Sequence, residues 1–147
     1  MVLAKEDYMP AEYRILQQHN LVHITFSGVM TRGDVLRMRS ALVTDKAYRA
    51  GLVEFVDTRP ADEFEITYNG MMNIIRHYQE LFGAYGFPAC MIIVAPGDLG
   101  FGMARMFEIM SSEDMRFRPL LTQNDEELRL ELDRAGISAA GRVALGL

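Results

Sequence analysis

The sequence has few of the residues that mark disulfide-bonded or membrane-spanning proteins. It contains one cysteine, Cys90, and no tryptophan. A single cysteine excludes an internal disulfide framework and is typical of a reducing compartment. Acidic residues lie where a secretory signal would place its apolar core. The longest uncharged apolar run, residues 89–95, is far shorter than the roughly 20 residues that span a bilayer. We therefore expect a cytoplasmic protein without a membrane span.

A basic surface is also absent from the composition. The formal net charge is -5 and the pI about 5.2, whereas nucleic-acid binders usually carry a basic patch. The three histidines, His19, His23 and His77, have none of the spacings typical of a metal site. No G-x-S-x-G motif marks a serine nucleophile. We expect no nucleic-acid partner, no metal, no cofactor and no catalytic residue.

The chain does have the composition of a single globular domain. Half of its residues are apolar, and a chain of this length buries roughly 70% of its unfolded surface. We assign residues 1–147 to one domain with a core over about 13–135. The 11 methionines are unusual, because methionine fills irregular gaps in a core and also lines adaptable ligand pockets. Core filling is the favoured reading, and an apolar pocket or partner surface is the alternative.

Hydrophobic alternation predicts the strands. The stretch "EYRILQQHNLVHITFSGVM" is typical of two strands around a His-Asn turn. Apolar runs predict strands at residues 52–56 and 89–95, and a last strand at 115–121 that Pro119 places at an edge or a bulge. Because helices separate the later strands, these strands are expected to be parallel neighbours. The prediction is an α/β sandwich, β-β-α-β-α-β-α-β-α, with a mixed sheet of about five strands and helices mainly on one face.

A period near 3.6 predicts the helices. The first predicted helix begins at Thr31. The next two cover residues 67–85 and 99–110, and the last extends from residues 124–125 to Gly136. Thr31 and Asp34 have the spacing of a capping box. The acidic residues of "ADEFE" at 61–65 are expected to form a solvated loop and the N-terminus of the second helix, where negative charge is favoured. The tail over residues 137–147 is expected to dock on the sheet or on a second subunit. In the first helix, a buried stripe is expected from Val35, Met38 and Leu42. The arginines of this helix are expected mostly off the stripe: Arg32, Arg37 and Arg39.

A glycine-rich segment follows the strand at 89–95. Residues 97–102 spell G-x-x-G-x-G, the reverse of the dinucleotide fingerprint, and lack the Gly-Lys-Ser/Thr of a phosphate loop. Free N–H groups at a helix start favour an anion, and Arg105 lies close by in the sequence. A tight turn with close helix–sheet packing explains the same glycines. We favour the turn and retain Gly100, Gly102, Met103 and Arg105 as candidate ligand-binding residues.

Asp57 and Arg59 follow the strand at 52–56. If this strand and the strand at 89–95 are parallel neighbours, both carboxyl ends meet at the edge where α/β sheets bind ligands. Asp57 could then bond Arg105, or Arg59 and Arg105 could grip a carboxylate or phosphate. A third possibility, an enzyme that uses Asp57 with Arg105 or the glycine turn, is disfavoured. The structural alternative is that Asp57 caps the following loop and that both arginines are solvated.

The chain resembles the bacterial SpoIIAA-like proteins of the STAS superfamily from about Tyr13 to Leu132. The resemblance rests on "SGVMTRGDVLRMRSAL", "FVDTR" and "IIVAPGDLGFGMARMFE". It implies a sheet with helices largely on one face. It also implies a homodimer or a regulatory protein partner, and a small hydrophobic or anionic ligand. The Met- and aromatic-rich helices at 71–85 and 99–110 fit an apolar pocket.

The resemblance also implies a phosphorylation switch as an alternative function. In the signalling members, the anti-sigma-factor antagonists, a phosphorylated serine lies in an Asp-Ser-Ser-Gly-type turn. This chain has Asp57-Thr58-Arg59-Pro60 there, so Asp57 matches and Thr58 carries the hydroxyl. Phosphate on Thr58 would place nearly two negative charges beside Arg59. Our first hypothesis is a non-enzymatic ligand- or partner-binding module, and the alternative is a regulator switched at Thr58.

Overall fold

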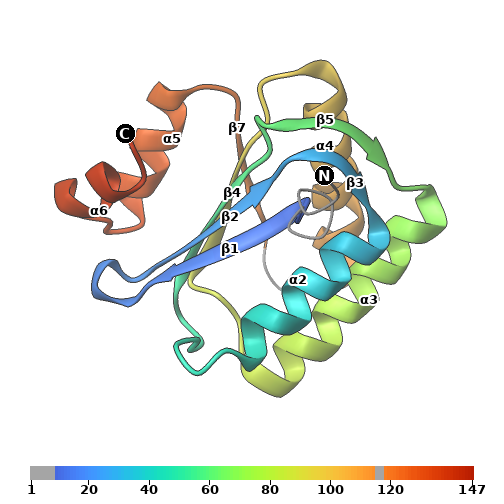
Figure 1. Cartoon of the computed structure of the whole chain (residues 1–147), viewed down its shortest axis with the longest axis horizontal. Coiled ribbons are helices and arrows are strands. Elements are labelled where there is room, and N and C mark those ends of the chain that lie inside the picture. Colours follow the sequence, from blue (N-terminus) through green and yellow to red (C-terminus); the bar gives the residue numbers. More distant parts are fainter. Residues whose placement is uncertain (1–8, 115–117) are drawn as a thin grey trace, which may run out of the picture.

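The computed structural model describes residues 9–114 and 118–147, and its centre is a mixed five-stranded sheet (Figure 1). The sheet order is β1-β2-β4-β6-β7. The strand β1 is antiparallel to β2, and the remaining pairs are parallel, as predicted. Its strands are β1 (Ala11–Leu16), β2 (Leu21–Phe26), β4 (Val53–Asp57), β6 (Cys90–Val94) and β7 (Leu120–Thr122). The strand β7 is an edge strand directly after Pro119, and residues 115–117 of the predicted strand lie outside the described residues.

Helices cover both faces of this sheet, with the larger group on one face (Figure 1). One face carries α2 (Arg32–Thr44), α3 (Tyr68–Tyr85) and α4 (Asp98–Asp114). The other carries α5 (Asp125–Arg134), with α6 (Ala139–Ala144) beside it. The short helix η1 (Gln17–His19) and Asn20, with a φ of 58°, make the turn between β1 and β2.

The helix ends follow the predicted capping chemistry. The hydroxyl of Thr31 accepts from the backbone N–H of Asp34, and the Asp34 carboxylate accepts from the backbone N–H of Thr31. These reciprocal bonds satisfy donors that a helix start leaves without partners. At the end of α3, Gly86 has a φ of 93°, and a Cβ there would lie 2.6 Å from the Cβ of Ala50. Both the conformation and the close approach require glycine.

A second, two-stranded sheet was not predicted. The strand β3 (Gly28–Thr31) pairs in parallel with β5 (Ala61–Glu65). The expectation of a solvated loop at residues 61–65 is therefore wrong. Asp62, Glu63 and Glu65 are exposed, whereas Phe64 is partly buried against the core. The acidic composition of this strand concealed Phe64, which packs against the core together with Ala61.

The central sheet separates two hydrophobic cores. The larger core lies under α2, α3 and α4 and includes Ile24, Val56 and Ile93. The smaller core lies under α5 and includes Phe55 and Leu132. Successive residues of β4 alternate between these cores, because strand side chains point to opposite faces in turn. Neighbouring residues at the end of β4 therefore point to opposite faces of the sheet.

The C-terminal tail docks against the sheet, which is one of the two predicted placements. Ile137 is buried in the smaller core, and Gly141 of α6 packs closely against Ile137 and His19. Across the described ranges 9–114 and 118–147, none of the helices combines the length and apolar character needed to cross a membrane.

Candidate functional site

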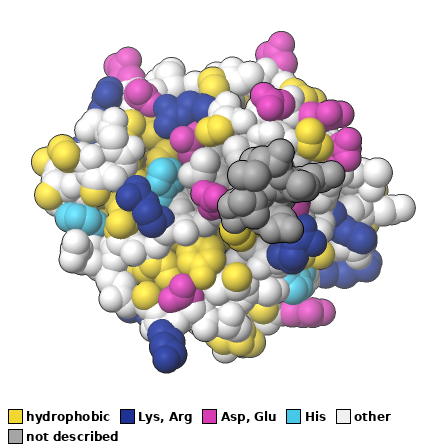
Figure 2. All heavy atoms as spheres, in the orientation of Figure 1, with side chains coloured by type: hydrophobic (Ala, Val, Ile, Leu, Met, Phe, Trp, Pro, Cys, Tyr) yellow, Lys and Arg dark blue, Asp and Glu magenta, His cyan; other side chains and the backbone are white. Residues whose placement is uncertain are grey.

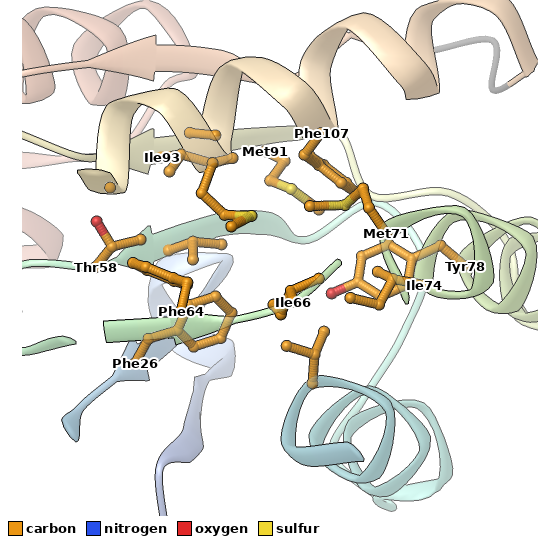
Figure 3. Close-up of a pocket in the computed structure, with 15 residues that line it drawn as sticks. Phe26, Thr58, Phe64, Ile66, Met71, Ile74, Tyr78, Met91, Ile93 and Phe107 are labelled. Carbon is orange, nitrogen blue, oxygen red and sulfur yellow. The ribbon is translucent and has the colours of Figure 1, made fainter. Parts of the chain in front are cut away.

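A cavity of about 70 Å³ lies between the central sheet, β5 and the helices α3 and α4 (Figure 3). Its deep walls come from the sheet and are fully or nearly fully buried, among them Val56, Met91 and Ile93. Its outer walls are partly exposed: Phe64 of β5 and the following Ile66 on one side, Gly100 and Met103 of α4 on the other.

The lining of this cavity is almost entirely apolar. Met71, Met91 and Met103 line it together with aliphatic and aromatic side chains. Of the described residues that line it, Thr58 and Tyr78 contribute the side-chain oxygens (Figure 3). Apolar cavities in proteins stay dry and bind apolar molecules, and methionine adapts its shape to them. The excess of methionine noted in the sequence is thus partly concentrated around one cavity.

Thr58 forms the outer polar corner of the cavity. Its side chain is 7% exposed, and its hydroxyl donates to the carbonyl oxygen of Val94 at 2.7 Å. A Cβ placed on Gly100 would lie 3.5 Å from the Thr58 hydroxyl oxygen, so the start of α4 packs directly on this corner. The predicted phosphorylation residue is therefore a buried side chain whose hydroxyl proton is already bonded.

Tyr78 closes the inner end of the cavity. Its ring meets the rings of Phe82 and Phe107 edge to face, at centroid distances of 5.8 and 5.7 Å. The guanidinium of Arg39 lies over the same ring, 4.4 Å from the centroid, which is within cation–π range. Arg39 donates to both carboxylate oxygens of Glu54 at 2.7 Å, and both side chains are fully buried.

This buried pair corrects the prediction that Arg39 lies off the buried stripe of α2. Burial is the largest single effect and opposes the charge on Arg39, but the interactions with Glu54 and Tyr78 together outweigh it and raise the pKa of Arg39. A signal was available in the spacing, because Arg39 follows Val35 by four residues and precedes Leu42 by three. Glu54 stood inside an apolar run and supplied the matching charge.

The opposite face of the sheet carries a polar cluster at the end of β4. Asp57 accepts from Arg59 Nε at 2.9 Å, and Arg59 Nη1 donates to Asp125 of α5 at 2.6 Å. The hydrogen bond to Asp57 raises the pKa of Arg59. Figure 2 shows charged and histidine side chains close together where β1 and β2 lie beside α5 and α6.

His23 of β2 belongs to this polar face. Its ring stacks on Phe55 at 4.9 Å and lies 3.4 Å from Arg14 and 3.5 Å from Thr25. Burial lowers the pKa of His23, and Arg14 lowers it further, whereas Asp57 raises it. His23 therefore lies on the face of the sheet that carries the smaller core.

The structure divides the six candidate ligand-binding residues. Gly100 and Met103 line the cavity, as does Thr58, whereas Asp57 and Arg59 lie on the opposite face of the sheet. Arg105 pairs with Glu108 of its own helix at 2.7 Å rather than with Asp57. Gly102 is exposed on α4, and its added Cβ would meet no atom within 4 Å. Gly100 and Met103 therefore lie together at the cavity, and the other four candidate residues lie outside it.

The remaining chemically reactive side chains have structural surroundings. Ser40 and His77 bond between α2 and α3 at 2.9 Å. Cys90 is half-buried, and burial raises the pKa of its thiol. Within the described part of the chain, no group of three or more His, Cys, Asp and Glu side chains could hold a metal ion.

Comparison with known proteins places this architecture. No family model and no curated protein sequence matches the chain. The anti-sigma factor antagonist SpoIIAA in its unphosphorylated form aligns with 84% of this chain and 97% of its own, at 11% identity and a TM-score of 0.51. This chain has a SpoIIAA-like fold. An uncharacterized protein of the DUF3478 family with a SpoIIAA-like fold, from Shewanella loihica PV-4, aligns with 80% of this chain and 87% of its own, at 13% identity and a TM-score of 0.45. The predicted fold class is confirmed.

Proposed function

We propose that this chain is a non-enzymatic binding module that holds a small apolar molecule in the cavity beneath β5 and α4. The observation that carries the proposal is the lining, which joins three methionines to aromatic and aliphatic walls and, among the residues that the structure describes, includes no charged side chain. The outer walls are partly exposed, so a ligand has a route between β5 and α4. Such sites combine an apolar surface with few polar groups.

The charges favour the apolar version of the predicted ligand over the anionic one. Arg59 already binds two carboxylates, and Arg105 binds Glu108. Asp98 in the first turn of α4 adds a negative charge where the helix start would attract an anion. An anion at this edge would therefore compete with carboxylates of the protein itself.

The cavity volume limits the ligand. A cavity of about 70 Å³ is smaller than the roughly 150 Å³ that holds benzene in an engineered protein. A short aliphatic chain fits with little change, and a larger group requires the methionines to move. Unbranched methionine side chains can make this adjustment at low energetic cost.

Methyl NMR tests the proposal directly. The protein is labelled at its methionine methyl groups and titrated with 1-alkanols from ethanol to 1-octanol. We expect the methyl signals of Met71, Met91 and Met103 to shift saturably, while that of the 58% exposed Met9 does not. Equal shifts at all four methyl groups, or no saturable shift, would contradict the proposal.

A cavity-filling variant provides the matched comparison. Ala104 lines the cavity and is 7% exposed, so Ala104→Leu adds three carbons to the space that the alkanol would occupy. We expect at least a tenfold loss of alkanol affinity. Ala84→Leu makes the same change at an exposed position of the neighbouring helix α3 and should leave affinity unchanged. Equal effects of the two substitutions would argue against binding in the cavity.

A regulatory protein partner is the second candidate function, and likeness to the anti-sigma factor antagonist SpoIIAA in fold favours it. The proposed switch at Thr58 requires a kinase to reach a side chain that is 7% exposed. Partner capture with Thr58→Glu and Thr58→Ala as baits tests it, since a switch retains a partner on one bait and loses it on the other. The homodimer and the cytoplasmic location stay predictions, and light scattering of the full chain tests the former.

A further inference from the structure

The buried pair between Arg39 and Glu54 has features that stability alone does not explain. Both side chains are fully buried, and their two bonds are short and parallel. One polar atom of the pair, Arg39 Nε, and the hydroxyl oxygen of the nearby Tyr48 are buried without a hydrogen-bond partner among the described residues. An unsatisfied buried polar atom is costly, and well-packed apolar residues often replace such a pair without loss of stability.

What the pair contacts suggests its role. Arg39 lies over the ring of Tyr78, which also meets the rings of Phe82 and Phe107 in edge-to-face contacts. The Tyr78 ring lines the cavity, but Arg39 and Glu54 do not. The guanidinium is planar, and its two bonds to Glu54 fix its orientation against the ring. The cavity's inner wall is therefore in direct contact with an ion pair outside the cavity.

We infer that Arg39 and Glu54 are positioning residues that hold Tyr78 against the inner end of the cavity, and so set the length of the apolar ligand. This inference rests on the proposed function. Tyr78 is the wall that a lengthening chain reaches, since it lies at the opposite end of the cavity from Thr58 (Figure 3), and the partly exposed Gly100 packs beside Thr58. Without the guanidinium behind it, the ring can withdraw from the cavity.

The experiment replaces the pair with apolar residues of similar length, Arg39→Met with Glu54→Leu. Affinities for 1-alkanols from ethanol to 1-octanol are measured by the methionine methyl titration. We expect the chain length of highest affinity to increase by at least one methylene, with at least a threefold gain for the longer alkanol over the shorter one. The same optimum in wild type and double variant would overturn the inference.

Controls separate positioning from general loosening. Leu132→Ala opens the smaller core on the opposite face of the sheet and should leave the preferred length unchanged. An equal shift in Leu132→Ala would overturn the inference. Arg39→Lys is a second variant, because an ammonium keeps the charge beside Glu54 but cannot cover the ring as a guanidinium does; we expect the same direction of shift.

Failure of this inference and failure of the proposed function give different results. If wild type binds no alkanol, the proposed function is overturned. The ring-flip rate of Tyr78 in the free protein, measured by aromatic NMR, then still tests the positioning role. We expect at least a tenfold faster flip in the double variant and an unchanged rate in Leu132→Ala. Equal rates in wild type and double variant would overturn the positioning role itself.

Discussion

The strand β4 carries two carboxylates that pair with arginine in opposite surroundings. Glu54 points to the face of α2 and α3, where it and Arg39 are fully buried. Asp57, three residues later, points to the face of α5 and pairs with Arg59, whose side chain is 36% exposed. The alternation of a strand produces both sites from one short segment.

The two arginine–carboxylate pairs have similar geometry, but the loss of one partner is expected to have different consequences in the buried and in the exposed pair. A buried pair has no water to replace a lost partner, so each member depends on the other. The exposed pair can exchange protein partners for water, and salt screens it. We therefore expect variants of Arg39 to change folding and the cavity, and variants of Arg59 to change little besides the local surface.

The largest expected effect is that of Arg39→Met alone. It leaves the Glu54 carboxylate buried without a counter-charge, and breaking such a pair costs about 3–5 kcal/mol. We expect the free energy of unfolding to fall by this amount in urea denaturation at neutral pH. Arg37→Met is the matched control on the same helix, because the Arg37 side chain is 74% exposed; it should cost less than about 1 kcal/mol.

The double variant sharpens the comparison. With Glu54→Leu added to Arg39→Met, no unpaired charge is left at this site, and the stability should return to that of wild type or exceed it by about 1–4 kcal/mol. A loss in the double variant equal to the sum of the two single losses would show that the pair itself stabilises the fold. In that case the buried and the exposed pair would both stabilise the fold and would differ only in how strongly they do so.

The contrast also explains what could be predicted from the sequence. Alternation and the 3.6-residue period marked the five strands of the main sheet and the helices, because burial on known faces imposes those periods. Asp57 ends an apolar run, so its place at the sheet edge followed directly. Glu54 lay inside the same run, and Arg39 was read by its charge rather than by its spacing from Val35. The cavity depends on β5, whose acidic residues concealed Phe64.

A smaller effect is expected from removing the hydroxyl of Thr58. Thr58→Val loses the bond to the carbonyl of Val94 while keeping the side-chain shape, which costs about 0.5–1.5 kcal/mol. Thr122→Val is a matched control, since that buried hydroxyl donates to Ile93 at 2.9 Å but does not line the cavity. Both should lower the urea midpoint similarly, and Thr58→Val alone should change alkanol affinity. Equal affinities in the two variants would argue against Thr58 as a cavity wall.

On the exposed side, Asp125→Asn is expected to change stability by about 0–1 kcal/mol. The substitution removes one of the two carboxylates on Arg59 but leaves Asp57 in place. Because exposed pairs are screened, the difference from wild type should shrink between low salt and about 1 M salt. Urea denaturation at both salt concentrations measures this. A large loss that persists in high salt would mean that the polar cluster is as dependent on its charges as the buried pair.

The smallest effect concerns His23, where the polar face is partly buried. Burial is the main cause that lowers its pKa; Arg14 and Arg59 act in the same direction, and Asp57 opposes them. A folded-state pKa below the unfolded value of about 6.5 means that the unfolded chain binds the proton more readily. The contribution to stability is therefore complete above pH 6.5 and is lost as pH falls through the folded-state pKa.

In urea denaturation from pH 8 to pH 5, His23→Phe should lose less stability than wild type, because phenylalanine can keep the stacking on Phe55 and cannot titrate. Identical losses of stability in the two proteins would show that other groups cause the pH dependence. The stability would then depend as little on the charge of His23 as we expect it to depend on Arg59.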